Sequence, residues 1–163
     1  MNDYIYLGTI TSTHGIKGEL KVKSDFEFKD RCFKKGFNIY IDNKSFSISS
    51  YREHKQFDLI TIDNMLDINL INQYIGKEVY ILKSDLKLKD NEFLYQDLIN
   101  CEIIDNKKSL GTVRDLRKTN IILLEIDFQP KYFIPLVDEY IEKVDIQNKK
   151  IYTKGAEELI LWK

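Results

Sequence analysis

Apolar and polar residues alternate along short stretches of this chain, a pattern typical of half-buried β-strands. In the first half these stretches are separated by turn-forming residues, and Asp42-Asn43-Lys44 predicts a tight hairpin. The predicted strands are Tyr4–Ile10, Glu19–Ser24, Phe37–Ile41, Ser45–Tyr51, Phe57–Ile62 and Glu78–Leu82. Between the first two strands, Ser12–Gly18 reads as a loop with two glycines.

One short helix is predicted within this first set of strands. Asp67 is positioned to cap it, apolar residues recur with helical spacing over Ile68–Ile75, and Gly76 ends it. A further helical turn is expected within Asp25–Phe33.

A polar and charged stretch, Ser84–Glu92, separates the two halves of the chain. We therefore predict a first domain over 1–86, a linker over 87–92 and a second domain over 93–163. Each half closes most economically as a small barrel without a free strand edge. The strands predicted in the second half are Glu102–Asp105, Ser109–Asp115, Ile121–Phe128, Tyr132–Pro135, Ile141–Asp145 and Lys150–Thr153.

The composition supports an all-β fold with short helices. The chain has 23 Ile, 5 Val, 7 Thr, 10 Tyr, 9 Phe and 1 Trp among 163 residues, whereas Ala156 is its single alanine. β-Branched and aromatic side chains suit pleated sheets, and alanine is the best helix former.

The charge balance excludes a protein that holds nucleic acid by a large basic surplus. Lys and Arg total 25 against 26 Asp and Glu, a formal net charge of −1. The longest apolar run, Ile121–Leu124, is far shorter than the roughly 20 residues of a membrane helix. Met1–Tyr4 lacks the basic region of a secretory signal, so we expect a cytoplasmic protein without membrane contact.

The sequence predicts neither an enzyme nor a metal or cofactor site. Cys32 and Cys101 stand far apart, which excludes a CxxC motif and a zinc site and favours two buried free thiols. His14 and His54 are isolated in sequence, and the common nucleophile, metalloprotease, phosphate-binding and dinucleotide-binding motifs are absent.

The glycine-containing segment is the first candidate for contact with a partner. Gly15 and Gly18 permit unusual backbone angles and close approach, and Lys17 and Lys21 suit phosphate or an acidic protein surface. A plain β-turn with a basic rim explains the same residues. The GxxG spacing also occurs in KH domains, but there it joins two helices, whereas both flanks here are strand-like.

Pro135 marks the second candidate, because it interrupts an apolar strand. A proline without an N–H belongs at a sheet edge or a bulge, where a partner strand or peptide can be received. Core packing is the commoner explanation for the apolar residues around it.

In their order along the chain, these elements resemble the RimM family of bacterial ribosome maturation factors. The resemblance covers nearly the whole sequence and is specific through the succession of its motifs. They are His-Gly-x-x-Gly-Glu within Thr13–Val22, then Glu78–Tyr80, Tyr95–Ile99, Leu110–Val113, Ile134–Val137 and Val144-Asp145.

The resemblance implies a six-stranded N-terminal barrel like those of translation factors and flavin reductases, and a C-terminal PRC barrel. It implies a non-enzymatic factor, without a cofactor, that binds the immature small (30S) subunit and assists head maturation and 16S rRNA processing. Its implied partners are the nineteenth small-subunit ribosomal protein and nearby 16S rRNA. Two closed barrels need no partner chain, so we expect a monomer.

We expect the first barrel's loop to reach RNA, and an acidic and apolar surface of the second barrel to meet the basic ribosomal protein. Family members often carry two adjacent tyrosines and a Trp-His pair where this chain has Phe93–Gln96, so its aromatic platform is smaller. The loop around Asn120 is also shorter than in the family. The expected partner-binding residues are Thr13, His14, Gly15, Lys17, Gly18, Lys21, Phe93, Tyr95, Asp97, Leu98, Pro135 and Leu136.

Two other functions stay open. A flavin- or nucleotide-binding barrel predicts a coloured or nucleotide-loaded protein. A general RNA-binding module predicts a steep salt dependence and little preference among RNAs. Its local patches would be Lys17, Lys21 and Lys23, or Arg114, Arg117 and Lys118, although neighbouring acids favour ordinary solvated faces.

Overall fold

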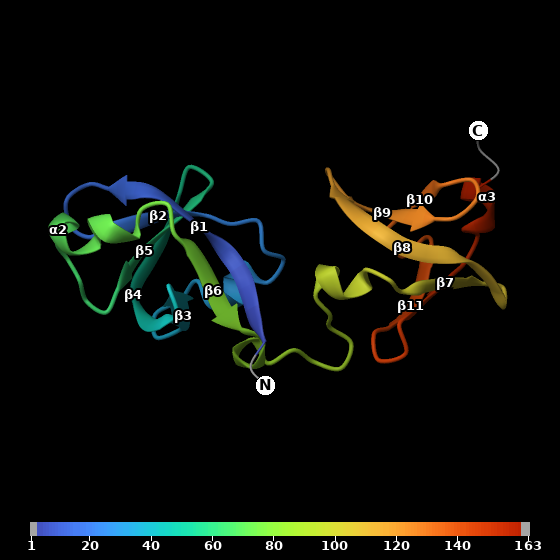
Figure 1. Ribbon diagram of the computed structural model, residues 1–163, viewed down its shortest axis with the longest axis horizontal. Helices are drawn as coiled ribbons and strands as arrows, with labels where there is room; N and C mark the ends of the chain where they lie inside the picture. Colours follow the sequence, from blue (N-terminus) through green and yellow to red (C-terminus); the bar gives the residue numbers. More distant parts are fainter. Residues whose placement is uncertain (1–2, 161–163) are drawn as a thin grey trace. The chain divides into compact units, whose positions relative to one another are not determined.

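The computed structural model describes residues 3–160, and the chain divides into two compact units, 1–87 and 88–163 (Figure 1). Across residues 3–160, no helix combines the length and the apolar character needed to span a membrane.

The first unit is a closed six-stranded barrel. Its strands are β1 (Tyr4–His14), β2 (Glu19–Lys23), β3 (Asn38–Ile41), β4 (Lys44–His54), β5 (Phe57–Ile62) and β6 (Glu78–Leu82). They are hydrogen-bonded in the order β1-β2-β5-β4-β3-β6, and β1 pairs with β6 to close the ring (Figure 1). Asp42 and Asn43 both adopt positive φ in the turn between β3 and β4, so the predicted hairpin and barrel are confirmed.

Two of the strands are longer than the alternation predicts. β1 continues past Ile10 to His14, because a bulge between Ile10 and Ser12 restores pairing with β2 up to the pair His14 and Glu19. Thr13 and His14 therefore belong to the strand and not to the predicted loop, which shrinks to residues 15–18. β4 likewise extends past Tyr51 to His54, and the added residues are exposed or half-buried.

Short helices fill the ends of this barrel. They are α1 (Lys29–Cys32), α2 (Ile68–Ile71) and the 3₁₀ helices η1 (Asn72–Tyr74) and η2 (Lys83–Leu86). The Asp67 carboxylate accepts a hydrogen bond from Asn69 N at 2.9 Å, which confirms the predicted cap of α2. η2 was not predicted, since the polar stretch that contains it read as connecting chain, yet its Leu86 is buried.

The second unit is a six-stranded half-barrel. Its strands are β7 (Glu102–Asp105), β8 (Lys108–Lys118), β9 (Ile122–Asp127), β10 (Tyr132–Pro135), β11 (Ile141–Asp145) and β12 (Lys150–Thr153), with η3 (Tyr95–Leu98) and α3 (Glu157–Ile160) at its ends. The order is β10-β9-β8-β7-β12-β11, and β12 pairs with β7 in parallel.

Within residues 88–160 the hydrogen-bonding ladder does not close, so the expectation of a second barrel without free edges is wrong in this detail. β10 and β11 are its edge strands. Pro135 lies at the end of β10, which confirms the predicted edge position, because an edge strand needs no N–H on its outer side.

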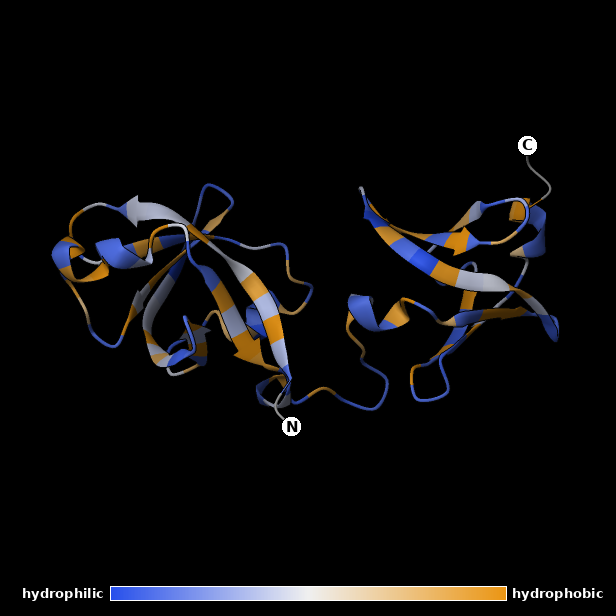
Figure 2. Ribbon diagram, viewed as in Figure 1, coloured by the Kyte–Doolittle hydropathy of each residue, from blue (hydrophilic) through white to orange (hydrophobic). Residues whose placement is uncertain are grey.

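Both cores follow from the alternation of the strands. Ile5 and Leu7 of β1 are buried and alternate with the exposed Tyr4 and Tyr6, and Figure 2 shows the same alternation as colour changes along the strand ribbons. Cys32 and Cys101 are fully buried free thiols, as predicted.

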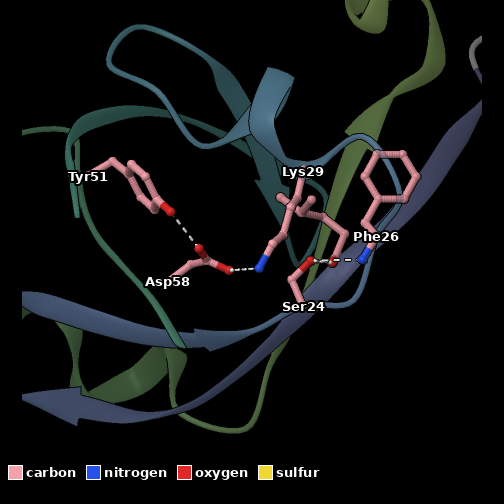
Figure 3. Close-up of polar contacts among 6 residues, drawn as sticks. Ser24, Phe26, Lys29, Tyr51 and Asp58 are labelled. Carbon is pink, nitrogen blue, oxygen red and sulfur yellow. Dashed lines mark hydrogen bonds and ion pairs between the residues drawn. The ribbon is translucent and has the colours of Figure 1, made fainter. Parts of the chain in front are cut away.

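A buried carboxylate anchors α1 to the wall of the first barrel. Asp58 of β5 is fully buried, accepts a hydrogen bond from Tyr51 Oη at 2.7 Å, and pairs with Lys29 Nζ at 3.2 Å (Figure 3). Nearby, Ser24 Oγ donates to Leu7 O at 2.6 Å and accepts from Phe26 N at 3.3 Å. Burial and the bond to Asp58 raise the pKa of Tyr51. The strand pattern over Phe57–Ile62 did not predict a buried charge.

Candidate functional site

The loop between β1 and β2 is seated on the segment between β5 and α2. Gly18 has φ +90°, and a side chain there would collide with Met65 O and lie 2.8 Å from Leu66 Cα. Ile16 O also accepts a hydrogen bond from Ile68 N at 3.3 Å. Gly18, one of the predicted partner-binding residues, is therefore buried, and its role in this structure is to let the loop pack closely on Met65 and Leu66.

The seated loop exposes one cation beside apolar side chains. Lys17 is exposed, and no ion pair of Lys17 occurs within residues 3–160. Ile16 is 75% exposed, Leu66 62% and Leu70 49%, all well above what core packing leaves accessible. We call Ile16, Lys17, Leu66 and Leu70 the loop patch. A cation with apolar neighbours suits contact with a macromolecule better than binding of a small ligand.

Side-chain pairs hold together the strand ends next to the loop. Arg52 donates two hydrogen bonds of 2.8 Å to the carboxylate of Glu19, which lowers the pKa of Glu19 and raises that of Arg52. The rings of His14 and His54 lie 4.8 Å apart. Burial and the neighbouring His14 lower the pKa of His54. His14 thus packs against a second ring at the base of the loop and lies opposite Glu19 in the β1–β2 ladder.

The remaining predicted residues of the first unit lie on the strands below the loop. Thr13 is half-buried and pairs with Leu20 across the β1–β2 ladder. The Nζ of Lys21 lies 4.6 Å from the ring centre of Phe57, so this lysine covers the barrel wall. Gly15, at φ +67°, is exposed and has open space around it. Of the predicted set, Gly15 and Lys17 lie in the exposed loop.

In the second unit, the segment that opens the domain is largely a support for the core. Leu98, one of the predicted partner-binding residues, is fully buried in the 3₁₀ turn of η3 and packs in the core. Phe93 and Tyr95 are half-buried and pack against the same core. Asp97 is half-buried, and its carbonyl oxygen accepts a hydrogen bond from Lys149 Nζ at 2.9 Å.

Phe93 also lines a recess of about 470 Å³ beside the turn between β11 and β12. The recess combines apolar surface with carboxylates. Its charged lining residues are Asp90, Glu92, Lys143 and Asp145, which gives three carboxylates against one ammonium.

Pro135 and Leu136 lie at the opposite edge of the sheet order from β11. Pro135 pairs with Leu123 of β9, and Leu136 N donates to Ile122 O at 2.8 Å. Both residues are half-buried, and Leu136 packs against the core of the unit. The six residues predicted in this domain are therefore not gathered around one site.

The arginines of β8 are ion-paired rather than free. Glu125 of β9 is almost fully buried. Its Oε1 lies 2.9 Å from Arg117 Nη2, and its Oε2 lies 3.8 Å from Arg114 Nε. The guanidinium carbon of Arg117 also lies 5.0 Å from the ring centre of Phe133. This arrangement fits the solvated face that the sequence favoured over a basic RNA patch.

No group of three or more His, Cys, Asp or Glu side chains placed to hold a metal ion occurs among residues 3–160.

Comparison with known proteins agrees with this description. Residues 5–86 match the RimM N-terminal domain, and residues 95–159 match the RimM PRC barrel domain. Among curated relatives, the ribosome maturation factor RimM of an Exiguobacterium species is 31% identical over 158 residues, covering 91% of this chain and 92% of the relative. The protein of the same name from Staphylococcus aureus is 32% identical over 164 residues, covering 96% and 98%.

Two solved structures are also similar. A putative 16S ribosomal RNA processing protein RimM from Pseudomonas aeruginosa aligns with a TM-score of 0.42 and 18% identity over 93% of this chain and 97% of its own. The N-terminal domain of RimM from Thermus thermophilus aligns with a TM-score of 0.45 and 15% identity, covering 51% and 93%. Because both domain models match in order and relatives above 30% identity span nearly the full length, the chain belongs to the RimM family of ribosome maturation factors.

Proposed function

We propose that this protein is a cytoplasmic, monomeric and non-enzymatic assembly factor that binds the immature 30S subunit. It assists maturation of the subunit head and processing of 16S rRNA by contacting the nineteenth small-subunit ribosomal protein and nearby rRNA. The observation that carries the proposal is the match of both units, in order, to the two RimM domains.

The recess of the second unit supports contact with a basic ribosomal protein. Three carboxylates against one lysine favour a positively charged partner, and Phe93 adds apolar surface. The loop patch of the first unit supports contact with RNA, because the ammonium of Lys17 is exposed at the tip of a loop held in a fixed shape.

The balanced charge suits a factor that must leave the particle. A net charge of −1 gives little unspecific affinity for rRNA, so binding depends on two specific contacts. Because both units belong to one chain, binding through one raises the effective concentration of the other. We infer that the factor stabilises an otherwise slowly formed head conformation and leaves when the mature surface is complete.

Calorimetric titration with the purified nineteenth ribosomal protein at two salt concentrations tests the protein contact. Saturable one-to-one binding that survives the higher salt supports a specific interface. Absence of binding by the folded protein contradicts a direct contact with this partner.

The RNA contact is tested with Lys17→Glu and with the control Lys44→Glu, which changes another exposed lysine, in the β3–β4 hairpin. Lys17→Glu should weaken binding to immature subunits, most strongly at low salt, and Lys44→Glu should not. Equal binding by both variants at every salt concentration would refute the role of the loop.

A further inference from the structure

Four tyrosines lie together on the outer wall of the first barrel. Tyr4 and Tyr6 come from β1, Tyr80 from β6 and Tyr40 from β3, and Tyr80 pairs across the ladder with both Tyr6 and Tyr40. The ring centres of Tyr4 and Tyr40 are 5.2 Å apart, and those of Tyr6 and Tyr80 are 5.9 Å apart, both edge-to-face. We call these four residues the tyrosine strip.

The tyrosine strip is not required by the core of the barrel. Ile5 and Leu7 of the same strand fill the interior, whereas Tyr4 remains 53% exposed and Tyr6 43% exposed. The rings are nevertheless held in place, because each exposed ring packs against a half-buried partner and Tyr6 Oη hydrogen-bonds with Thr9 Oγ1. Aromatic surface that is ordered before binding loses little conformational entropy when a partner arrives.

A polar recess with a cation adjoins the strip. It measures about 390 Å³, within the usual range for a ligand-sized pocket, and its lining residues are Tyr6, Thr9, Lys23, Ser24, Asp25 and Gln56. Lys23 is exposed, and no ion pair of its ammonium group occurs within residues 3–160. Lys21, two residues earlier on β2, adds a second positive charge along the same outer face.

We propose that the tyrosine strip and its recess bind unpaired nucleotides of a single-stranded RNA segment. Bases stack on the rings of Tyr4 and Tyr6, a base edge enters the polar recess, and Lys23 contacts a phosphate. This proposal deepens the proposed function, on which it rests, by naming the kind of rRNA that the first barrel takes.

The chemistry of the face favours RNA over a protein partner. The strip has flat rings with hydroxyl groups that match the stacking faces of nucleotides, next to the ammonium of Lys23, which suits a phosphate. The amide of Gln56 and the carboxylate of Asp25 in the recess can hydrogen-bond the polar edge of a base. The exposed aliphatic side chains Ile16, Leu66 and Leu70 belong to the loop patch and are not part of the strip. A duplex offers no free base faces along its length, so the strip selects single strands.

The test uses fluorescence anisotropy of fluorescein-labelled uridylate and adenylate octamers with the full-length protein. Tyr6→Ala and Tyr6→Leu should each weaken binding by about five-fold or more, the loss typical of removing one stacked base, whereas Tyr6→Phe should bind like the wild type. Lys23→Ala should reduce the slope of log affinity against log salt by about 0.7, the value for one single-strand phosphate contact. Lys44→Ala serves as the control for charge and should leave the slope unchanged.

Several results would overturn the proposal. Wild-type affinity in Tyr6→Leu, whose unfolding midpoint verifies the fold, would show that the ring is not a stacking surface. Equal affinity of the wild type for the octamer and for the matched duplex would contradict selection of single strands. If Tyr6→Leu lost binding to the nineteenth ribosomal protein while its RNA binding stayed unchanged, the strip would be a protein interface. Binding of the wild type to immature subunits is measured in parallel, so failure of the proposed function would be seen separately.

Discussion

Replacing each loop glycine by alanine in turn separates two contributions to stability: the cost of an unfavourable backbone conformation and the cost of a steric clash. Both Gly15 and Gly18 have positive φ, which costs any other residue about 1–2 kcal/mol. A Cβ at Gly15 meets open space, so Gly15→Ala should lose only that amount. A Cβ at Gly18 would collide with Met65 O and reach within 2.8 Å of Leu66 Cα, neither of which can rotate away.

The loop must therefore lift from its support in Gly18→Ala. Overpacking typically adds about 1–3 kcal/mol. Loss of the hydrogen bond between Ile68 N and Ile16 O adds about 0.5–1.5 kcal/mol. With the backbone strain, Gly18→Ala should lower the free energy of unfolding of the first unit by roughly 2.5–6.5 kcal/mol. The lifted loop should also misplace Lys17.

Urea unfolding followed by NMR measures both units within one sample. The amide signals of Leu20 and Leu59 report on the first unit, and those of Ile103 and Val113 on the second. Gly18→Ala should shift the midpoint of the first unit far more than Gly15→Ala does, and neither should shift that of the second. Equal losses in the two variants would refute the claim that close packing on Met65 and Leu66 seats the loop.

Three further predictions concern stability and reactivity. Lys29→Met leaves the buried Asp58 carboxylate without its cation, so urea unfolding should show a loss of about 3–5 kcal/mol in the first unit. Burial raises the pKa of Cys32 to about 12, so in a thiol-labelling time course read by mass spectrometry Cys32 should react only after denaturation. The folded-state pKa of Glu19 lies below the ordinary 4.5, so its bond to Arg52 stabilises the protein above that pH and is lost as pH falls through the lower folded value. Arg52→Gln should therefore flatten the acid limb of a melting-temperature profile.

The strand pattern was predictable where one side of a strand is buried. Glu19–Lys23 shows this, since Leu20 and Val22 alternate with lysines and the structure buries both. Strand ends were less predictable, because residues such as His14 and His54 extend ladders beyond the core and carry no apolar signal.

The functional surfaces were harder to predict, because exposure depends on neighbours distant in sequence. Leu98 is buried by a 3₁₀ turn that its local pattern does not indicate. Gly18 supports the loop because it meets a segment almost fifty positions further on. The tyrosine strip needs three strands to be adjacent, and Tyr40 pairs with Tyr80 through a register that only the closed barrel sets.

The most direct test of the account is cosedimentation of the protein with immature and mature 30S subunits on sucrose gradients at near-physiological salt. The account predicts that the wild type sediments with immature subunits and remains free in the presence of mature ones. Lys17→Glu should weaken the binding to immature subunits. Equal binding to both particles, or binding to neither, would contradict the proposal that this RimM-family protein recognises an unfinished subunit.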